Sequence, residues 1–333
     1  MAVHFSRRAW LMAASSLASA ALLGTPAHAV TDAELDAEAS RRWDRERRFQ
    51  ATRFGRTAYV DRGAGPVALF LHGFPLSSFQ WRGAMDRLSS VRRCIAPDWM
   101  GLGATEVARG QAVTPNDQLA MLIDFLDALS IEAVDVVAND SGGAIAQLLA
   151  VRHPTRVRSL LLTNCDVEPD SPPAALKPVF ELAEMGIWPD AWLEPWLKDG
   201  TKARAADGLG GLCYANPAHP TDAALQQYLG PILSSLERKD LANRYALGLR
   251  PNPLAGIEPA LRQLQIPTRI IWGMSDDIFA KDSPDYLARV LPRVEGVRRI
   301  AEAKLFFPEE YPDIIAQEAR ALWRVAGENG SPR

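Results

Sequence analysis

The sequence has few of the residues that most often supply catalytic or metal-binding groups. Its 333 residues include only five histidines and three cysteines. The cysteines are Cys94, Cys165 and Cys213, and no two of them have the spacing of metal ligands. An odd number leaves at least one of them without a disulfide partner. We therefore expect buried free thiols and no metal site.

The sequence also lacks a strong charge of either sign. Lysine and arginine together number 37 and aspartate and glutamate 40, which gives a net charge of -3 at pH 7. No long basic run follows the N-terminal segment, so the composition gives no reason to expect a nucleic-acid partner. After that segment no apolar run approaches the ~20 residues that a membrane-spanning helix needs. We therefore expect no stable membrane span.

The N-terminus has the features of an export signal. Arg7 and Arg8 precede a mildly apolar stretch, and the segment Ala27–Ala29 fits a signal-peptidase site. The surroundings of the arginine pair resemble a twin-arginine motif, with Trp10 where Phe is usual. The apolar stretch is short for an uncleaved anchor, which is the alternative. We predict that residues 1–29 are a cleaved twin-arginine-like signal peptide and that the mature protein is periplasmic or secreted.

Strand-like and helix-like patterns alternate along most of the remaining chain, which predicts an α/β fold with a mostly parallel sheet and helices on both faces. The predicted strands are 52–54, 56–61, 67–71, 94–98, 133–138, 157–163, 267–272 and 297–301, and the main predicted helices are 116–129, 144–153 and 314–325. Between the two groups of strands the chain is rich in Pro, Trp and Gly and contains no strand-like run, which indicates a helical cap. The predicted parts are an N-terminal helical extension (30–50), a core in two segments (51–167 and 254–326), the cap (168–253) and a tail (327–333).

Polar clusters follow four of the predicted strands. They are His72-Gly73-Phe74-Pro75, Asp98, Asn139-Asp140-Ser141-Gly142-Gly143 and Gly273-Met274-Ser275-Asp276-Asp277. Ligands of an open α/β sheet gather beyond the carboxyl ends of its strands. We therefore expect these clusters to meet at one site.

The third cluster has the pattern of a nucleophile elbow, a strained turn between a strand and a helix. Such a turn needs small residues around the nucleophile. Ala138, Gly142 and Gly143 satisfy this need when Asp140 is at the tip. Placing Ser141 at the tip is the alternative, but a small residue would then be needed where Asn139 stands. A third interpretation is that Asp140 only caps the following helix.

These clusters, with Trp81-Arg82 and Ala96-Pro97-Asp98, resemble the α/β-hydrolase superfamily, and most of all the branch that holds haloalkane dehalogenases, fluoroacetate dehalogenases and epoxide hydrolases. The resemblance covers about residues 53–325. It implies the α/β-hydrolase fold, a mostly parallel doubly wound sheet with an inserted helical cap, and no cofactor. In that branch an aspartate attacks the substrate carbon to give an ester, and a His–Asp pair then activates the water that hydrolyses it.

By position, the resemblance implies that Asp140 is the nucleophile and that the backbone N–H groups of Phe74 and Ser141 form the oxyanion hole. It implies that Asp276 is the acid that orients the histidine, with the adjacent Asp277 as the alternative.

The histidine that the resemblance requires is missing. It should lie shortly before Glu309-Glu310, where Leu305 stands, and no histidine follows His219. His72 belongs to the oxyanion loop, His153 ends a helix and His219 lies in the cap. Sequence proximity makes Lys304, Glu309 and Glu310 candidate replacement bases. A general base contributes roughly 10²–10⁴-fold to such a step, so its loss would let the ester persist.

The features that would identify the substrate are incomplete. Ser141 stands where haloalkane dehalogenases usually carry Trp, and Phe74 resembles its counterpart in epoxide hydrolases and fluoroacetate dehalogenases. Epoxide opening uses tyrosines of the cap as acids, and Tyr214, Tyr228 and Tyr245 are the candidates.

The resulting hypothesis is a cofactor-independent hydrolase in which Asp140 faces an apolar pocket between sheet and cap. Its substrate or ligand would be a small apolar electrophile of the haloalkane, epoxide or ester type, and its base would be atypical or missing. One alternative is a catalytically degenerate protein that binds a small ligand. Others are a lyase or isomerase that uses Asp140 as a proton carrier, and an esterase that uses Ser141.

Overall fold

A computed structural model describes residues 31–329 of the chain. The predicted signal peptide (residues 1–29) and most of the predicted tail lie outside the described residues. Within the described part no helix is long and apolar enough to cross a membrane.

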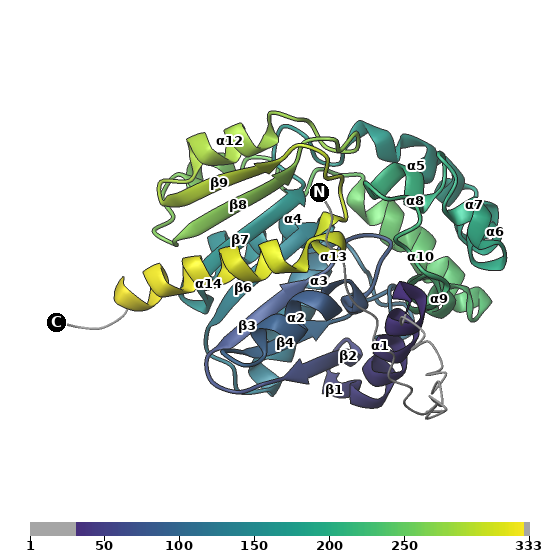
Figure 1. The fold of residues 1–333 in the computed structure, drawn as a ribbon, viewed down its shortest axis with the longest axis horizontal. Helices are drawn as coiled ribbons and strands as arrows, with labels where there is room; N and C mark the ends of the chain where they lie inside the picture. The colour runs from purple at the N-terminus through teal and green to yellow at the C-terminus, as the bar shows by residue number, and fades with distance from the viewer. Residues whose placement is uncertain (1–30, 330–333) are drawn as a thin grey trace, which may run out of the picture. The chain divides into compact units, whose positions relative to one another are not determined.

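One mixed sheet forms the centre of the described chain (Figure 1). Its strands are β1 (Arg48–Thr52), β2 (Gly55–Arg62), β3 (Val67–Leu71), β4 (Arg93–Pro97), β5 (Glu106–Val107), β6 (Val134–Asp140), β7 (Val157–Cys165), β8 (Thr268–Gly273) and β9 (Val294–Ile300). Their order is β1-β2-β4-β3-β6-β7-β8-β9, and β5 pairs with β2. The pairs from β4 through β3, β6, β7 and β8 to β9 are parallel, whereas β2 runs antiparallel to its neighbours.

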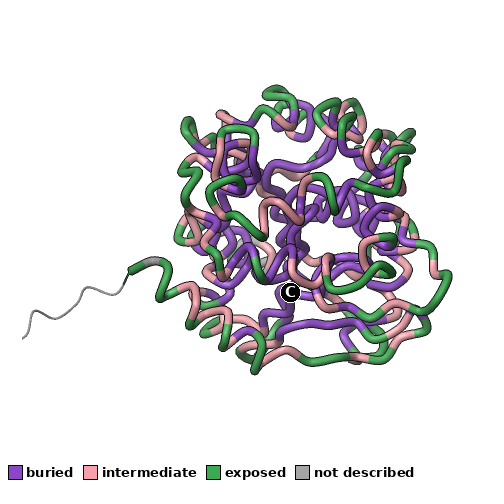
Figure 2. Tube along the Cα trace, turned by 90° about the vertical axis from the view of Figure 1, so that its right-hand side faces the viewer, coloured by how far each residue is buried: buried purple, intermediate pink, exposed green. Residues whose placement is uncertain are grey.

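The central strands are apolar because both of their faces are covered. Every residue of β3 and β6 is buried. The continuous apolar run of β3 is typical of a parallel strand between two helical layers, whereas β6 carries Asp135 near its start and Asn139 and Asp140 at its end. The tube in Figure 2 shows buried chain in the interior and exposed chain around it. The sheet is therefore a rigid support for the residues at the carboxyl ends of its strands.

The helices of the core are α1 (Asp32–Glu46), α2 (Arg82–Leu88), α3 (Pro115–Ala128), α4 (Ser141–Arg152), α11 (Glu258–Leu261), α12 (Ser283–Val290), α13 (Phe307–Glu310) and α14 (Pro312–Asn329). Helix α14 packs on α2 and crosses in front of the strands in Figure 1, whereas α4 packs on β6, β7 and α3. The predicted α/β class and the doubly wound sheet are confirmed.

Between β7 and β8 the chain forms helices and no named strand. These helices are α5 (Lys177–Glu184), α6 (Glu194–Lys198), α7 (Gly200–Ala203), α8 (Leu209–Cys213), α9 (Asp222–Leu233) and α10 (Leu236–Leu249). They gather at the right of Figure 1. The three candidate tyrosines of the cap, Tyr214, Tyr228 and Tyr245, are all fully buried.

The N-terminal part of the core differs from its prediction. The first helix ends at Glu46, and β1 begins at Arg48, inside the range predicted as a helical extension. Of the predicted strand 52–54, Thr52 is the last residue of β1, and Arg53 and Phe54 form the turn that joins β1 to β2. Edge strand β1 has no buried residue and is mostly polar, so it lacks the apolar pattern that marks a buried strand.

Candidate active site

Asp140 stands on a sharp turn between β6 and α4. Its backbone has φ +55° and ψ -134°, a conformation that non-glycine residues rarely adopt. A Cβ on Gly142 would lie 2.6 Å from the carbonyl oxygen of Leu71, and one on Gly143 would lie 2.3 Å from Cβ of Cys165. Only glycine at these two positions lets α4 start so close to β3 and β7. The turn therefore has the geometry that a nucleophile elbow requires.

The carboxyl of Asp140 is buried and accepts hydrogen bonds from the backbone. The N–H of Phe74 donates to Oδ1 at 2.6 Å, and the N–H of Ser141 also donates to this carboxyl. Burial raises the pKa of Asp140 to about 6, although these hydrogen bonds act in the opposite direction. The two N–H groups predicted for an oxyanion hole therefore converge on the side chain predicted as the nucleophile.

Aromatic side chains of the cap cover this turn. The ring of Phe74 stacks on Tyr245 at a centroid distance of 5.5 Å and on Trp188 at 4.9 Å. The hydroxyl of Tyr245 lies 3.3 Å from Oγ of Ser141. The buried indole N–H of Trp188 has no hydrogen-bond partner among the described residues. Of the three candidate tyrosines, Tyr245 is thus the one in contact with the elbow.

Asp276 lies in the loop after β8 and is held by hydrogen bonds. Asn164 Nδ2 donates to its Oδ2 at 2.8 Å, and the N–H of Ile278 donates to its Oδ1 at 2.9 Å. Burial raises the pKa of Asp276 to about 6, and its charge acts on Asp140. In contrast, the side chain of Asp277 is 77% exposed and pairs with Lys281. The geometry therefore favours Asp276 over Asp277 as the site acid.

Leu305 occupies the predicted histidine position and is buried. Its carbonyl oxygen accepts a hydrogen bond of 3.1 Å from Nδ2 of Asn139, the residue before Asp140. Asn139 also bonds the carbonyl oxygen of Asn164 and accepts from Gln80. A network of amide groups thus ties the Leu305 backbone to the elbow, and the Leu305 side chain brings no titratable group to it.

The candidate replacement bases next to Leu305 are already bound to other groups. Glu309 accepts hydrogen bonds from Tyr214 at 2.5 Å, from Tyr228 at 2.6 Å and from Arg82 at 2.5 Å. Because Tyr214 and Tyr228 donate their hydroxyl protons to Glu309, neither tyrosine is available as an acid at Asp140. Their hydroxyl protons are committed to a buried carboxylate. Burial, and then the charge of Glu309, raises the pKa of both tyrosines.

The other two candidates next to Leu305 bond the cap backbone. Glu310 accepts from the N–H groups of Ala215 and Asn216. Lys304 donates from Nζ to the carbonyl oxygen of Gly211 at 2.6 Å. These contacts give both side chains a structural role.

The described histidines do not supply a base at Asp140. Nδ1 of His72 contacts the carbonyl oxygen of Gly73 at 2.9 Å, and its Nε2 accepts from the N–H of Trp99 at 3.1 Å. Burial lowers the pKa of His72 to about 4, so the ring is neutral. His153 follows the last residue of α4, the end remote from Asp140. His219 stacks on Tyr214 at the Glu309 cluster.

Asp166 is a buried acid that no sequence motif marks. It follows Cys165, the end of β7, which lies opposite Asp140 in the register of the sheet. Ser171 Oγ donates to its Oδ1 at 2.7 Å. Burial, and then the charge of Asp140, raise the pKa of Asp166 to about 7. An acid directly after a buried central strand was the sequence signal that could have identified it.

Cys213, at the end of cap helix α8, also lies near the two predicted acids. Burial raises the pKa of its thiol, and the charges of Asp276 and Asp140 add to this effect. All three cysteines are free and buried, as predicted. Among residues 31–329, no group of three or more His, Cys, Asp and Glu side chains is placed to hold a metal ion.

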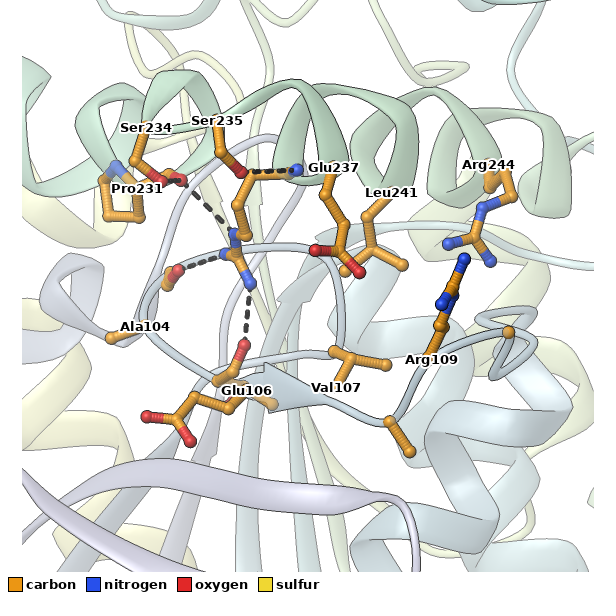
Figure 3. A pocket seen from close by; sticks show the side chains of 15 residues that line it. Ala104, Glu106, Val107, Arg109, Pro231, Ser234, Ser235, Glu237, Leu241 and Arg244 are labelled. Carbon is orange, nitrogen blue, oxygen red and sulfur yellow. Dashed lines mark hydrogen bonds between the residues drawn. The ribbon is translucent and has the colours of Figure 1, made fainter.

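A pocket of about 390 Å³ lies away from Asp140, between the segment 103–110 and the α9–α10 turn (Figure 3). Arg238 spans it and donates to the carbonyl oxygens of Gly103 and Thr105. Arg109 and Arg244 point toward each other across one end (Figure 3). Neither predicted acid lines this pocket, so it is not the apolar pocket expected in front of Asp140.

The chain is similar to known proteins over most of its length. Residues 66–203 match the family model of the alpha/beta hydrolase fold. The chain is 28% identical to haloalkane dehalogenase 2 of Mycobacterium tuberculosis, over 80% of this chain and 91% of that protein. It is 38% identical to an epoxide hydrolase of Caballeronia sordidicola, over 30% of this chain and 31% of that protein. The structure of epoxide hydrolase CorEH without ligand covers 84% of this chain and 98% of its own, with TM-score 0.69 and 20% identity.

Proposed function

We propose that this chain, which is related to haloalkane dehalogenases and epoxide hydrolases, is a hydrolase that acts on a small apolar electrophile through an ester on Asp140. The substrate would be of the haloalkane, epoxide or ester type. The observation that carries this proposal is the position of the Asp140 carboxyl, on a strained turn between two backbone N–H donors.

In the first step an oxygen of the Asp140 carboxylate attacks the substrate carbon and displaces a halide or opens an epoxide. The N–H groups of Phe74 and Ser141 hold the carboxylate in place for this attack. The unpartnered indole N–H of Trp188, stacked on Phe74, is available to the departing group. The aromatic cover excludes water, which strengthens these electrostatic interactions.

In the second step water attacks the carbonyl carbon of the ester. Negative charge develops on the carbonyl oxygen of the ester, which lies between the same two N–H donors. Because these donors are already in place, they stabilise this charge without rearrangement. Asp276 lies near the reacting carboxyl, but Leu305 leaves it without the histidine that it would orient. The proposed enzyme is therefore distinguished from its relatives at this second step.

The proposal is tested by treating the protein from Val30 onward with 1-bromobutane and styrene oxide. Intact mass reports an ester, and chromatography reports alcohol or diol. We expect an ester, a product or both with the natural sequence, and neither with Asp140→Asn. If the natural sequence gives neither with either compound, the hydrolase proposal is wrong for these classes, and a ligand-binding protein without turnover becomes the better explanation.

One observation favours a second candidate function, a lyase or isomerase in which Asp140 carries a proton. Burial raises the pKa of Asp140 to about 6, which suits proton transfer near neutral pH better than an ordinary carboxyl does. The two candidate functions differ in whether an oxygen atom from water enters the carboxyl of Asp140. A single turnover in H₂¹⁸O labels the carboxyl of Asp140 if an ester is hydrolysed and leaves it unlabelled if only a proton moves.

We also propose that the protein is exported, on the basis of Arg7, Arg8 and the segment Ala27–Ala29. The test fuses residues 1–35 to a reporter that folds before export. We expect transport and cleavage before Val30. Replacing both arginines by lysine should abolish transport, and a fusion that is transported equally well without the arginine pair would contradict the twin-arginine route.

A further inference from the structure

The described residues that flank the reacting carboxyl include one titratable side chain, that of Asp166, in which Oδ2 accepts no hydrogen bond from another residue. His72 uses both ring nitrogens on the backbone, and Glu309 accepts three hydrogen bonds. Both oxygens of Asp276 accept hydrogen bonds. Asp166 differs, because its partners are the hydroxyl of Ser171 on Oδ1 and its own backbone N–H.

We infer that Asp166 is the acid–base group of this site and does the work of the absent histidine, an inference that rests on the proposed function. Register places its backbone beside the Asp140 turn, because Cys165, its neighbour in sequence, lies opposite Asp140 at the ends of β7 and β6, and the two carboxyl groups are close enough for their charges to interact. Its backbone is anchored as well, since Nε2 of Gln147 on α4 donates to the carbonyl oxygen of Asp166 at 2.8 Å.

The charge distribution around Asp166 suits this role. The charged and titratable groups that act with it are Asp140 on β6, Asp170 in its own loop, Cys165 on β7 and Tyr245 on α10. None of them is a cation, so nothing stabilises a second negative charge beside Asp140. Near neutral pH the pair therefore shares one proton. The proton resides on Asp166 because the N–H groups of Phe74 and Ser141 stabilise the ionised form of Asp140, which leaves Asp140 as the anionic nucleophile.

The proton balance closes over a full turnover of an epoxide. When the Asp140 carboxylate opens the ring, Asp166 gives its proton to the ring oxygen and becomes a carboxylate. The ester on Asp140 carries no charge, so no neighbouring negative charge on Asp140 now disfavours the ionised form of Asp166. This carboxylate then takes a proton from water as the water oxygen bonds the ester carbon, and returns that proton to the departing alkoxide. The regenerated Asp140 carboxylic acid passes its own proton to Asp166, which restores the starting state.

A halide departs without a proton, so Asp166 is still protonated when the ester has formed. With the charge of Asp140 removed, Asp166 releases this proton to solvent and can then act as the base, and the released proton is the one that accompanies the halide in the net reaction. The inference therefore predicts different effects for the two substrate classes. With 1-bromobutane, Asp166→Asn should form the ester at close to the natural rate and hydrolyse it on the order of 10²-fold more slowly or worse. With styrene oxide, formation of the ester should be slowed as well. A side chain that only supports the fold would not separate the two leaving groups in this way.

The experiment follows ester formation and decay by rapid-quench intact mass for the natural sequence, Asp166→Asn and Asp170→Asn. The last is a matched control, because it makes the same change in the same loop and an amide oxygen can still accept from Ala280. A long-lived bromobutane ester in Asp166→Asn alone supports the inference. Ester decay at the natural rate in Asp166→Asn overturns it, and so does failure of this folded variant to form the bromobutane ester. Absence of ester and product in the natural sequence instead overturns the proposed function, and this inference with it.

Discussion

The carboxyl groups of Asp140, Asp166 and Asp276 lie at or just beyond the carboxyl ends of β6, β7 and β8. All three are buried, and burial disfavours the ionised form of each. Their pKa values are raised to about 6, 7 and 6 respectively. Asp276 accepts hydrogen bonds from Asn164 and from the N–H groups of Ile278 and Phe279, whereas Asp166 accepts only from the hydroxyl of Ser171 and its own N–H. A fold that keeps such an acid without a cation loses stability at the pH where the acid is ionised, which is a common property of functional sites.

This cost has a definite pH dependence. Below the ordinary pKa of 3.8, Asp166 is protonated in both the folded and the unfolded chain, and its burial is not penalised. As pH rises to about 7, the unfolded chain releases the proton that the folded chain retains, so the free energy of unfolding falls. Asp166→Asn should therefore be more stable than the natural sequence at pH 8, by up to about 4 kcal/mol, and nearly equal to it at pH 4.

Urea unfolding of Asp166→Asn and Asp170→Asn at pH 4 and pH 8 measures this difference. A gain in stability at pH 8 together with a loss of turnover would separate a functional acid from a structural one. An Asp166→Asn variant that is destabilised equally at both pH values would show that the carboxyl stabilises the fold and would contradict the expectation.

Leu305 gives a second prediction at the scale of one residue. Restoring a histidine there places an imidazole in the position from which the resemblance pairs it with Asp276. In an Asp166→Asn background, Leu305→His should accelerate decay of the bromobutane ester on the order of 10²-fold. Leu305→Gln, which is polar but not a base, serves as the control. The acceleration should disappear when Asp276→Asn is added, and an acceleration that survives this change would contradict the proposed role of Asp276.

At the scale of elements, the site depends on how closely α4 begins against β3. Gly142→Ala would place a methyl group 2.6 Å from backbone oxygens that cannot move aside easily. We expect a loss of about 2 kcal/mol in unfolding free energy and slower ester formation, because the turn that holds Asp140 must shift. Gly230→Ala on α9 is the control, since its nearest neighbour is the flexible end of Gln226. Equal effects of the two variants in urea unfolding would contradict this account.

The strands that could be predicted from sequence are mainly those that contain a run of apolar residues, because both faces of such a strand are buried. The strand Val67–Leu71 was predicted with its observed bounds because all five residues are apolar and buried. The edge strand Arg48–Thr52 was missed because its mostly polar residues carry no such pattern. In the site, small residues around Asp140 indicated the elbow. Asp166 could not be identified in the same way, because its role depends on register and burial rather than on a motif.

At the scale of the whole described chain, one buried cluster joins three parts of the molecule. Arg82 on α2 donates to Glu309 on α13 and to Asp36 on the N-terminal helix α1. Tyr214 and Tyr228, from the cap, donate to the same Glu309 carboxylate. The cluster thus connects the cap to the core and to the N-terminal helix. Glu309, the member of the cluster on α13, lies four residues after Leu305 in the sequence. A shift of the cap at this cluster would therefore be transmitted to the backbone next to the site.

Removing one charge of this cluster should therefore cost more than removing an exposed one. Glu309→Leu leaves the guanidinium of Arg82 buried with only Asp36 as a charged partner and removes the acceptor of two tyrosines, so we expect a loss of about 3 kcal/mol or more in urea unfolding. Adding Arg82→Met should recover part of that loss, because the uncompensated charge is removed. The exposed pair Arg87–Asp313 joins α2 to α14 and provides the control, where Asp313→Asn should have little effect.

The position of the cap in the same Glu309 and Arg82 variants can be measured separately from their stability. If the cluster seats the cap, Glu309→Leu should expose the cap to limited proteolysis and quicken quenching of Trp188 fluorescence by acrylamide, because the ring is now fully covered. The double variant should remain susceptible even where its stability recovers, since an apolar pair cannot accept hydrogen bonds from Tyr214 and Tyr228. A double variant that regains both stability and protection would contradict this, and would mean that packing alone holds the cap over Asp140.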